Sequence, residues 1–252
     1  QPEILLWVGC AGSYDRRNQQ VTKAVVQVLK AADVDFVILG NAERCTGDPA
    51  RRLGDEFTFL EQAMVNVETL NALGAKRIVT ACAHCFNTLA NEYPDFDGSY
   101  DVVHHTEFIR EVIDTNRLNL KPDSELAELT LHDPCYLSRH NDGAAAPRAA
   151  LGALNSGQLP IVEPEHHGSQ TFCCGAGGGR MWMEETVGDR VNIVRTDELL
   201  ETGADTIAVN CPFCTTMITD GVKAAERTED VKVKDISEIL REHVVSDRRP
   251  QA

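Results

Sequence analysis

Two stretches of the sequence decide the fold: residues 74–82 read GAKRIVTAC and residues 203–211 read GADTIAVNC. They align without a gap, and in each a glycine precedes a short apolar run that ends at a cysteine. A short apolar run bounded by a turn signal predicts a buried strand. Each stretch therefore predicts a buried strand with a cysteine at its carboxyl end, and the chain holds two copies of this arrangement.

The repeat extends over most of the chain. Three cysteines recur at a constant offset of 129 positions, because Cys45, Cys82 and Cys85 correspond to Cys174, Cys211 and Cys214. At the front of each copy, residues 4–10 (ILLWVGC) match residues 129–135 (LTLHDPC). A polar linker with Pro122 and Ser124 joins the copies. We therefore predict two domains, residues 1–118 with four cysteines and residues 119–252 with five.

Within each copy, apolar runs alternate with stretches of helical periodicity. Strands are predicted at residues 4–8, 35–39, 77–80 and 100–104 of the first copy, and at residues 129–132, 159–162, 206–209 and 231–233 of the second. Helices are predicted at residues 21–32, 57–70 and 187–200 and from residue 106, with Gly74 as a left-handed cap. Strands that alternate with helices form parallel sheets. The predicted fold is α/β, with two pseudo-symmetric lobes, each a small parallel sheet flanked by helices.

The nine cysteines fall into two sets. The first set is Cys10, Cys45, Cys82 and Cys85, and the second set is Cys135, Cys173, Cys174, Cys211 and Cys214. Most of them follow a predicted strand or lie in the loop after one, and parallel sheets gather ligands at the carboxyl ends of their strands. We therefore expect each set to converge at one sheet edge. An odd number of cysteines does not fit a closed disulfide framework, and so many thiols indicate a metal or cluster site.

The ligand count separates the candidate metals. Zinc closes with four ligands, which the first set offers, whereas the second set offers five. The adjacent pair Cys173 and Cys174 suits a polynuclear cluster better than one zinc tetrahedron, because neighbouring side chains diverge. A thioredoxin-like Cys-x-x-Cys would leave the other cysteines unexplained.

The overall charge excludes one class of partner. With 39 acidic and 24 basic side chains, the formal net charge is −15, which opposes binding to a nucleic-acid backbone. The longest apolar run, residues 4–8, is far shorter than the roughly 20 residues of a membrane-spanning helix. We expect this chain to lie outside the lipid, and its acidic surface to serve solubility or to steer a complementary partner.

The second copy carries a specific pattern: Cys135, then Cys173-Cys174-Gly175, then Cys211-Pro212-Phe213-Cys214. This pattern resembles the cysteine-rich CCG domain of the heterodisulfide reductase B-subunit type, and the resemblance covers nearly the whole chain. Related domains occur in iron–sulfur subunits of glycolate, lactate and glycerol-3-phosphate oxidoreductases. Residues 44–52 (RCTGDPARR) and 173–182 (CCGAGGGRMW) are similar to actinobacterial membrane-bound iron–sulfur reductases of the electron-transfer flavoprotein:menaquinone oxidoreductase type.

The resemblance implies a cofactor and a function. The second set would hold a non-cubane [4Fe–4S] cluster, in an electron-transfer module of an iron–sulfur oxidoreductase. Electrons would come from a reduced electron-transfer flavoprotein and leave towards menaquinone, through ferredoxin-type clusters and a quinone-binding membrane portion elsewhere in the assembly. The chain would then be a soluble portion on the cytoplasmic side of the cell membrane. Two alternatives remain: a heterodisulfide or thiol–disulfide reductase acting at the non-cubane cluster, and a zinc-stapled interaction module.

The first copy departs from this pattern at Arg44, which stands where the second copy has Cys173. The first set then holds a four-cysteine [4Fe–4S] cubane, a zinc ion or an altered cluster, and we favour the cubane. Arg44 either offsets the negative charge of a thiolate cluster or is a surface residue.

Further residues are candidates for contact with the clusters. His84 lies between Cys82 and Cys85 in the sequence, and it either hydrogen-bonds a sulfur of the first cluster, relays a proton, or is an ordinary polar turn residue. Gly175 and Gly177 open a glycine run that lacks the Lys-Ser/Thr of a phosphate loop, so close approach of the backbone to the second cluster is expected.

One pair of residues just before the second set has two interpretations. His132 and Asp133 form either a His–Asp catalytic pair or, with Pro134, a simple turn, and we favour the turn.

Overall fold

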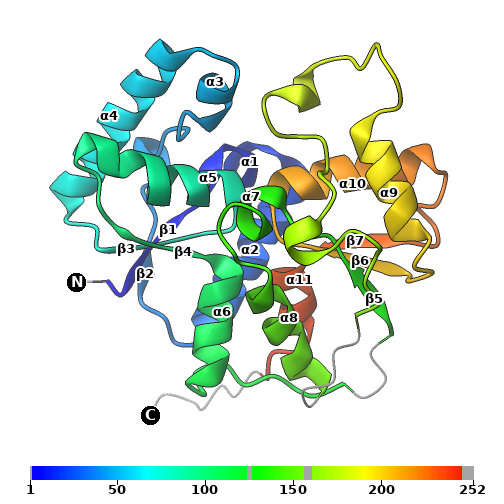
Figure 1. Ribbon diagram of the computed structural model, residues 1–252. Coiled ribbons are helices and arrows are strands. Elements are labelled where there is room, and N and C mark those ends of the chain that lie inside the picture. Colours follow the sequence, from blue (N-terminus) through cyan, green and yellow to red (C-terminus); the bar gives the residue numbers. More distant parts are fainter. Residues whose placement is uncertain (1, 124–126, 156–160, 246–252) are drawn as a thin grey trace.

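The computed structural model describes residues 2–123, 127–155 and 161–245, and within these ranges two parallel sheets form. The first sheet has the strand order β2-β1-β3-β4, with bounds β1 (Ile4–Trp7), β2 (Phe36–Val37), β3 (Arg77–Thr80) and β4 (Asp101–His104). The second sheet has the order β5-β6-β7, with bounds β5 (Leu129–Leu131), β6 (Thr206–Val209) and β7 (Lys232–Asp235). Figure 1 shows the two sheets on opposite sides of the molecule. The predicted α/β fold with two lobes is confirmed.

The second strand of each copy is the weakest match to the prediction. Residues 35–39 were expected to be a strand, but β2 pairs only through Phe36 and Val37. Residues 159 and 160 of the strand expected at 159–162 lie outside the described residues, and Ile161 forms an isolated parallel bridge with Leu129. This bridge lies beside β5 as β2 lies beside β1, so the two sheets share one strand order.

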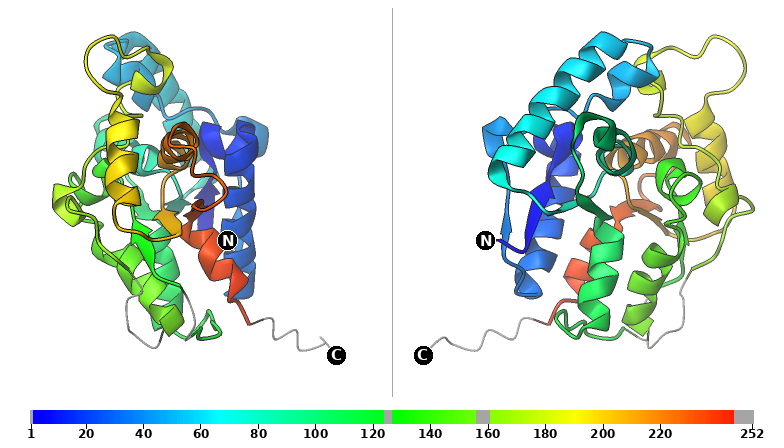
Figure 2. Two further views of the ribbon diagram at one scale, coloured as in Figure 1. Left: turned by 90° about the vertical axis from the view of Figure 1, so that its right-hand side faces the viewer. Right: turned by 60° about the vertical axis from the view of Figure 1, so that its left-hand side comes forward.

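Helices flank both sheets (Figures 1 and 2). Their bounds are α1 (Gly9–Tyr14), α2 (Arg16–Ala31), α3 (Asp48–Arg52), α4 (Glu56–Leu73), α5 (Ala83–Asn87), α6 (His105–Asp114), α7 (Cys135–Ser138), α8 (Ala145–Gly152), α9 (Val191–Leu200), α10 (Pro212–Ala224) and α11 (Ile236–Glu242). A π-helical turn, Thr88–Glu92, continues α5. Among the helices described, none is both long enough and apolar enough to span a bilayer.

Local sequence accounts for the ends of the long helices. The Asp15 carboxylate accepts the N–H of Asn18 at 2.8 Å and begins α2. Later in the first repeat, Gly74 takes a left-handed conformation with φ of 68° and ends α4, as predicted. The spacing of Phe57, Leu60, Met64, Val67 and Leu70 predicts one buried face for this helix, but Phe57 and Met64 are exposed. Apolar residues are spread around α4, so their spacing does not select one face.

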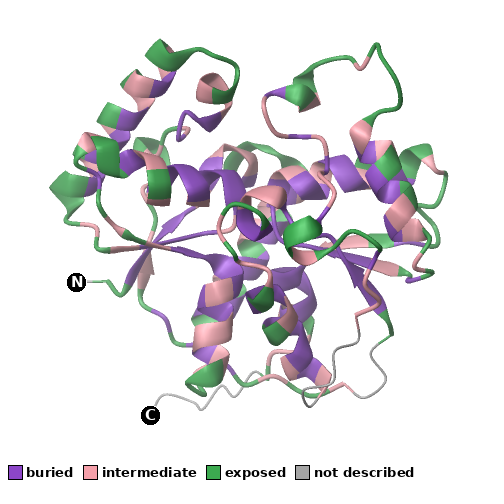
Figure 3. Cartoon of the chain, viewed as in Figure 1, coloured by how far each residue is buried: buried purple, intermediate pink, exposed green. Residues whose placement is uncertain are grey.

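The two repeats share their cores. One cluster of buried side chains joins Trp7 and Phe59 of the first repeat to Leu137 and Val209 of the second. A second cluster likewise contains residues of both repeats, and α11 packs on α2 while α8 packs on α6. Figure 3 shows the buried residues concentrated in these central elements. Each repeat therefore builds its own sheet but depends on its partner for a core.

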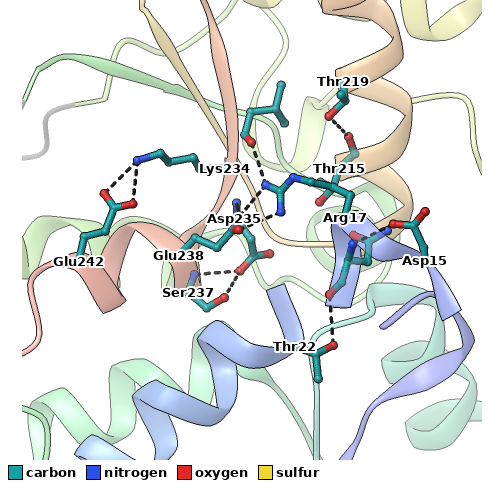
Figure 4. Close-up of polar contacts among 12 residues, drawn as sticks. Asp15, Arg17, Thr22, Thr215, Thr219, Lys234, Asp235, Ser237, Glu238 and Glu242 are labelled. Atoms are coloured by element: carbon teal, nitrogen blue, oxygen red, sulfur yellow. Dashed lines mark hydrogen bonds and ion pairs between the residues drawn. The ribbon is translucent and has the colours of Figure 1, made fainter. Parts of the chain in front are cut away.

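A polar lock joins α2 to α11 (Figure 4). The Arg17 guanidinium donates to both carboxylate oxygens of Glu238, at 2.8 and 2.6 Å, and to the carbonyl of Val233 at 3.0 Å. Glu238 also accepts the backbone N–H of Asp235 at 2.9 Å, which completes a capping box at the start of α11. One bidentate ion pair thus fixes a helix of the first repeat to a helix end of the second.

The linker is tied to the second repeat. Lys121 donates its backbone N–H to the carbonyl of His243 at 2.7 Å, and Val245 donates to the carbonyl of Asn119 at 3.0 Å. Ser124, which we placed in the linker, lies outside the described residues. Residues 119–123 therefore lie against the end of the second repeat. The predicted boundary after residue 118 places them in that same domain.

Candidate metal centre

Four cysteines mark the points where strands pass into helices. Cys10 lies in α1 after β1, and Cys82 caps α5 after β3. Cys135 begins α7 after β5, and Cys211 caps α10 after β6. All nine cysteines are free thiols, and the two Cys-x-x-Cys pairs and Cys174 are buried. The carboxyl ends of the strands therefore carry the thiols, as the sequence predicted.

The second set converges in the structure. The Cys135 thiol donates to the Cys173 sulfur at 3.9 Å, and the Cys214 thiol donates to the Cys174 sulfur at 3.4 Å. Cys211 completes the set, because it precedes α10, the helix that carries Cys214. Five sulfurs from three separate segments of the chain thus lie in one contact network.

Hydrogen bonding lowers the pKa of two of these thiols, Cys173 and Cys211. Donation from the Cys135 and Cys174 thiols lowers the pKa of Cys173, and the N–H of Gly175, 3.2 Å from its sulfur, lowers it further. Burial opposes ionisation of Cys211, yet hydrogen bonds from Cys214, Cys82 and His84 hold its pKa well below the ordinary thiol value. The site therefore favours thiolates, the form in which cysteine binds metals, at Cys173 and Cys211. Hydrogen bonding to neighbouring sulfurs and burial raise the pKa of the other three thiols, Cys135, Cys174 and Cys214.

The first set also converges. Donation from the Cys10 thiol lowers the pKa of Cys45 to about 6, and the N–H of Gly47 lies 3.5 Å from the Cys45 sulfur. The Cys82 sulfur accepts the N–H of Cys85 at 3.5 Å, and a Cβ built on Gly9, directly before Cys10, would lie 3.5 Å from the Cys85 sulfur. The hydrogen bond to Cys45 and burial raise the pKa of Cys10. These four thiols form a second network of their own.

The two sets touch each other at equivalent residues. The sulfurs of Cys82 and Cys211, which are related by the repeat, lie within 4.8 Å of one another. A ring nitrogen of His84 lies within the same distance of both sulfurs. The sequence predicted two separate sheet edges, but it did not predict that the two sets meet.

His84 was expected beside the first cluster, and the structure places it between the sets. Its Nδ1 lies 3.9 Å from the sulfur of Cys211, in the second repeat. The ring is buried between Tyr136 and Phe213, with centroid distances of 4.6 and 5.2 Å. Burial lowers the pKa of His84, but the hydrogen bond and charge of Cys211 outweigh burial and leave the pKa raised.

Arg44 is exposed and makes no hydrogen bond or ion pair with any described residue. Its neighbour Glu43 has a contact that the sequence did not suggest. The Glu43 carboxylate accepts the N–H groups of Val8 and Gly9, at 3.0 and 2.6 Å, directly before Cys10. Burial raises the pKa of Glu43 despite these two donors. No local motif marks Glu43, because its partners lie more than thirty residues away.

The two candidate glycines behave differently. Gly175 has a φ of 83° and donates its N–H to Cys173, as expected of a backbone close to the second set. Gly177 approaches His84 instead, because a Cβ built on Gly177 would lie 3.4 Å from the His84 Nε2. Gly177 and His84 also line a hollow beside the second set, together with the exposed Trp182.

His132 and Asp133 do not form a catalytic pair in the structure. The Asp133 carboxylate accepts both terminal nitrogens of Arg148, at 2.9 and 2.8 Å, and the N–H of Gly168 at 2.7 Å. His132 instead accepts the Nε–H of Arg195 at 3.0 Å. Burial and the positive charge of Arg195 lower the pKa of His132 to about 3. A ring nitrogen of His132 lies within 4.8 Å of the Cys174 and Cys214 sulfurs.

The donor set can be tested against the candidate metals. Both networks offer thiols that no disulfide consumes, and the second brings five of them together. One tetrahedral zinc uses four ligands, so the fifth thiol would be left over. A polynuclear iron–sulfur cluster accommodates thiolates at several irons. The residues of the second set therefore fit an iron–sulfur cluster, and those of the first set fit either an iron–sulfur cluster or zinc.

Comparison with known proteins gives the family context. The CCG cysteine-rich domain model matches residues 4–90 and 129–219, one match for each repeat. The chain is 43% identical over 244 residues to the probable iron–sulfur-binding oxidoreductase FadF of Bacillus subtilis, covering 96% of this chain and 34% of that protein. It is 44% identical over 246 residues to the EtfAB:quinone oxidoreductase of Syntrophomonas wolfei, covering 94% of this chain and 34% of that protein. The chain thus spans about a third of the length of these relatives.

A more distant relative belongs to a different enzyme. This relative is one component of the dihydromethanophenazine:CoB–CoM heterodisulfide reductase of Methanosarcina barkeri, and it is 32% identical over 247 residues, covering 95% of this chain and 58% of that protein. Among solved structures, a glutamate racemase of Bacillus anthracis aligns with a TM-score of 0.39 at 16% identity, covering 96% of this chain and 80% of that one.

Proposed function

The chain belongs to the cysteine-rich CCG domain family, and we propose that it is the iron–sulfur electron-transfer module of an oxidoreductase. In this proposal it accepts electrons from a reduced electron-transfer flavoprotein and passes them towards membrane menaquinone. The observation that carries the proposal is the convergence of five thiols from three segments, in contact with a second thiol network. Such a site needs no acid–base triad, because clusters supply the redox chemistry and the protein sets their potentials.

The proposal assigns each set a cofactor. Cys135, Cys173, Cys174, Cys211 and Cys214 hold a non-cubane [4Fe–4S] cluster. Cys10, Cys45, Cys82 and Cys85 hold a [4Fe–4S] cluster, with zinc as the alternative. The repeats, residues 1–118 and 119–252, act as two cofactor-binding domains on a shared core. The N–H of Gly175 and the ring of His84 then lie beside the ligand sulfurs Cys173 and Cys211.

The relatives support the choice of partners. One of them is named as an EtfAB:quinone oxidoreductase, and another is named as a probable membrane-anchored ferredoxin, that of Chromohalobacter salexigens, at 43% identity. We therefore place this chain outside the lipid, on the cytoplasmic side of a membrane-associated assembly. Ferredoxin-type clusters and the quinone site belong to other parts of that assembly, since this chain matches only about a third of each relative.

A second candidate function is heterodisulfide reduction, which the relationship to the Methanosarcina protein favours. The two functions are separated by their substrates. In one experiment, the full-length protein is mixed anaerobically with reduced electron-transfer flavoprotein. In a second experiment, the protein is first reduced chemically and then mixed with disulfides. Reduction of the clusters by the flavoprotein, without turnover of disulfides, supports electron transfer. Turnover of disulfides, without reduction of the clusters by the flavoprotein, would contradict electron transfer and support heterodisulfide reduction.

A further inference from the structure

Equivalent positions of the two repeats carry a buried ring with a nitrogen. Trp7 ends β1 and His132 follows β5, three residues before Cys10 and Cys135 respectively. Both side chains are fully buried. The indole Nε1 of Trp7 and the imidazole Nε2 of His132 have no hydrogen-bond partner among the described residues. Buried N–H groups without a partner are costly, so each position calls for an acceptor in addition to the hydrogen bonds that the described residues make.

The protonation of His132 follows from its neighbour. Arg195 donates its Nε–H to the His132 Nδ1 at 3.0 Å. An arginine side chain has donors and no acceptor, so Nδ1 must be the acceptor in this pair. A neutral imidazole with an accepting Nδ1 carries its proton on Nε2. The nitrogen that has no partner in the described structure is therefore an N–H donor.

Arg195 is itself held in place, so this tautomer is a fixed feature. Its side chain is fully buried, and Nη1 donates to the Glu198 carboxylate at 2.7 Å and to the carbonyl of His166 at 2.9 Å. Glu198 in turn accepts the N–H of His166 at 2.6 Å. A short hydrogen-bonded chain thus runs from Glu198 through Arg195 to the ring of His132.

Two thiols of the second set lie close to the His132 ring. A ring nitrogen of His132 lies within 4.8 Å of the sulfurs of both Cys174 and Cys214. Nδ1 is already occupied by Arg195, so Nε2 is the nitrogen free to reach them. Ligand thiolates accept hydrogen bonds, and such bonds make a cluster easier to reduce by stabilising its negative charge.

We propose that His132 is a positioning residue of the second site, which donates its Nε2–H to the ligand sulfur of Cys174 or Cys214 and raises the reduction potential of the cluster held there. The inference rests on the proposed iron–sulfur function of the second set. Arg195 fixes the donor tautomer of His132. It lies on α9, a helix that contributes no ligand. The indole of Trp7 marks the same position in the first repeat, where a ring N–H also lacks a partner among the described residues.

The test is an EPR-monitored redox titration of the full-length protein and its variants. His132→Phe keeps a ring and removes the donor, whereas His132→Gln keeps an N–H donor. His140→Phe is the matched control, because His140 is exposed and lies just after α7. We expect His132→Phe to keep its iron. The equilibrium constant for reduction of the second cluster should fall about tenfold, which lowers its reduction potential by about 59 mV for one electron. His132→Gln should restore most of the loss, and His140→Phe should match the wild type.

Two results would overturn the inference. An unchanged potential in His132→Phe with full iron content contradicts the hydrogen bond while leaving the proposed function intact. Wild-type protein without any iron–sulfur signal contradicts both. Should His132→Phe fail to retain iron, proton electron–nuclear double resonance on the wild type decides instead. An exchangeable proton coupled to the second cluster, with its partner nitrogen detected in histidine labelled with ¹⁵N, supports the donor, and the absence of that coupling refutes it.

Discussion

The Nδ1 of His84, in the first repeat, lies 3.9 Å from the sulfur of Cys211, in the second. The sulfur of Cys82 lies within 4.8 Å of the sulfur of the same cysteine, so each repeat contributes to the surroundings of the other. A repeat that folded alone would lack this contact and half of each shared core. In the proposed function, electrons would then pass between two adjacent cofactors without a carrier between them.

Removing the donor at His84 should affect the second site more than the first. In His84→Phe, the ring packing against Tyr136 and Phe213 is kept and the hydrogen bond to Cys211 is lost. The loss of about 1 kcal/mol of thiolate stabilisation should lower the potential of the second cluster by roughly 40 mV. EPR-monitored titration measures the potential, with the exposed His140→Phe as the control. A larger shift in the potential of the first cluster would contradict this prediction and show that His84 acts mainly on the first cluster.

Single ligand changes should separate the two sites. Cys173→Ser removes a thiolate that only the second repeat possesses, so it should abolish the second signal and about half of the iron. Cys10→Ser is the reciprocal variant and should remove the signal of the first site. Iron and sulfide content and EPR spectra of both proteins provide the measurement. If both signals survive in Cys173→Ser, the ligand assignment is wrong.

Alanine in place of Gly175 should reduce the iron content more than alanine in place of Gly178. Gly175 and Gly178 both have positive φ, 83° and 65°. A Cβ on Gly175 would lie 3.0 Å from the Val191 Cβ, whereas a Cβ on Gly178 meets nothing within 4 Å. Gly175→Ala should therefore lose iron from the second site, while Gly178→Ala should cost only about 1 kcal/mol of backbone strain and keep its iron. Equal iron contents in the two variants would contradict a role of the Gly175 backbone.

The lock between α2 and α11 should stabilise the paired repeats. Glu238 is nearly buried and Arg17 about one-third exposed, and their bidentate contact is lost in Arg17→Ala. We expect a destabilisation of about 2 kcal/mol, or a fall of roughly 4–8 °C in the melting temperature of the metal-loaded protein. Arg227→Ala is the control, since its pair with Asp230 is well exposed on both sides. Similar melting temperatures for the two variants would show that the lock adds no stability.

Local pattern was sufficient for most of the strands and for the repeat. Short apolar runs ending at Cys82 and Cys211 predicted β3 and β6, and the shared offset of 129 positions predicted the repeat. The contacts that shape the site are not local. Arg195 reaches His132 across 63 positions, and His84 reaches Cys211 across 127, so no spacing in the sequence relates them.

Two further differences have physical reasons. The exposed Phe57 shows that a helix with apolar residues on several sides does not reveal its buried face by periodicity. Of the two interpretations of Arg44, its exposed side chain fits the surface residue, while the adjacent Glu43 binds the backbone beside Cys10. Which of two neighbouring charged residues faces a site depends on the loop conformation, which composition does not determine.

Anaerobic quantitation of iron, acid-labile sulfide and zinc, combined with EPR of the full-length protein, decides whether the second thiol set holds an iron–sulfur cluster. We expect iron and sulfide in equal amounts, with an unusual signal that Cys173→Ser removes. A protein that contains zinc alone and shows no EPR signal in any redox state would contradict this expectation.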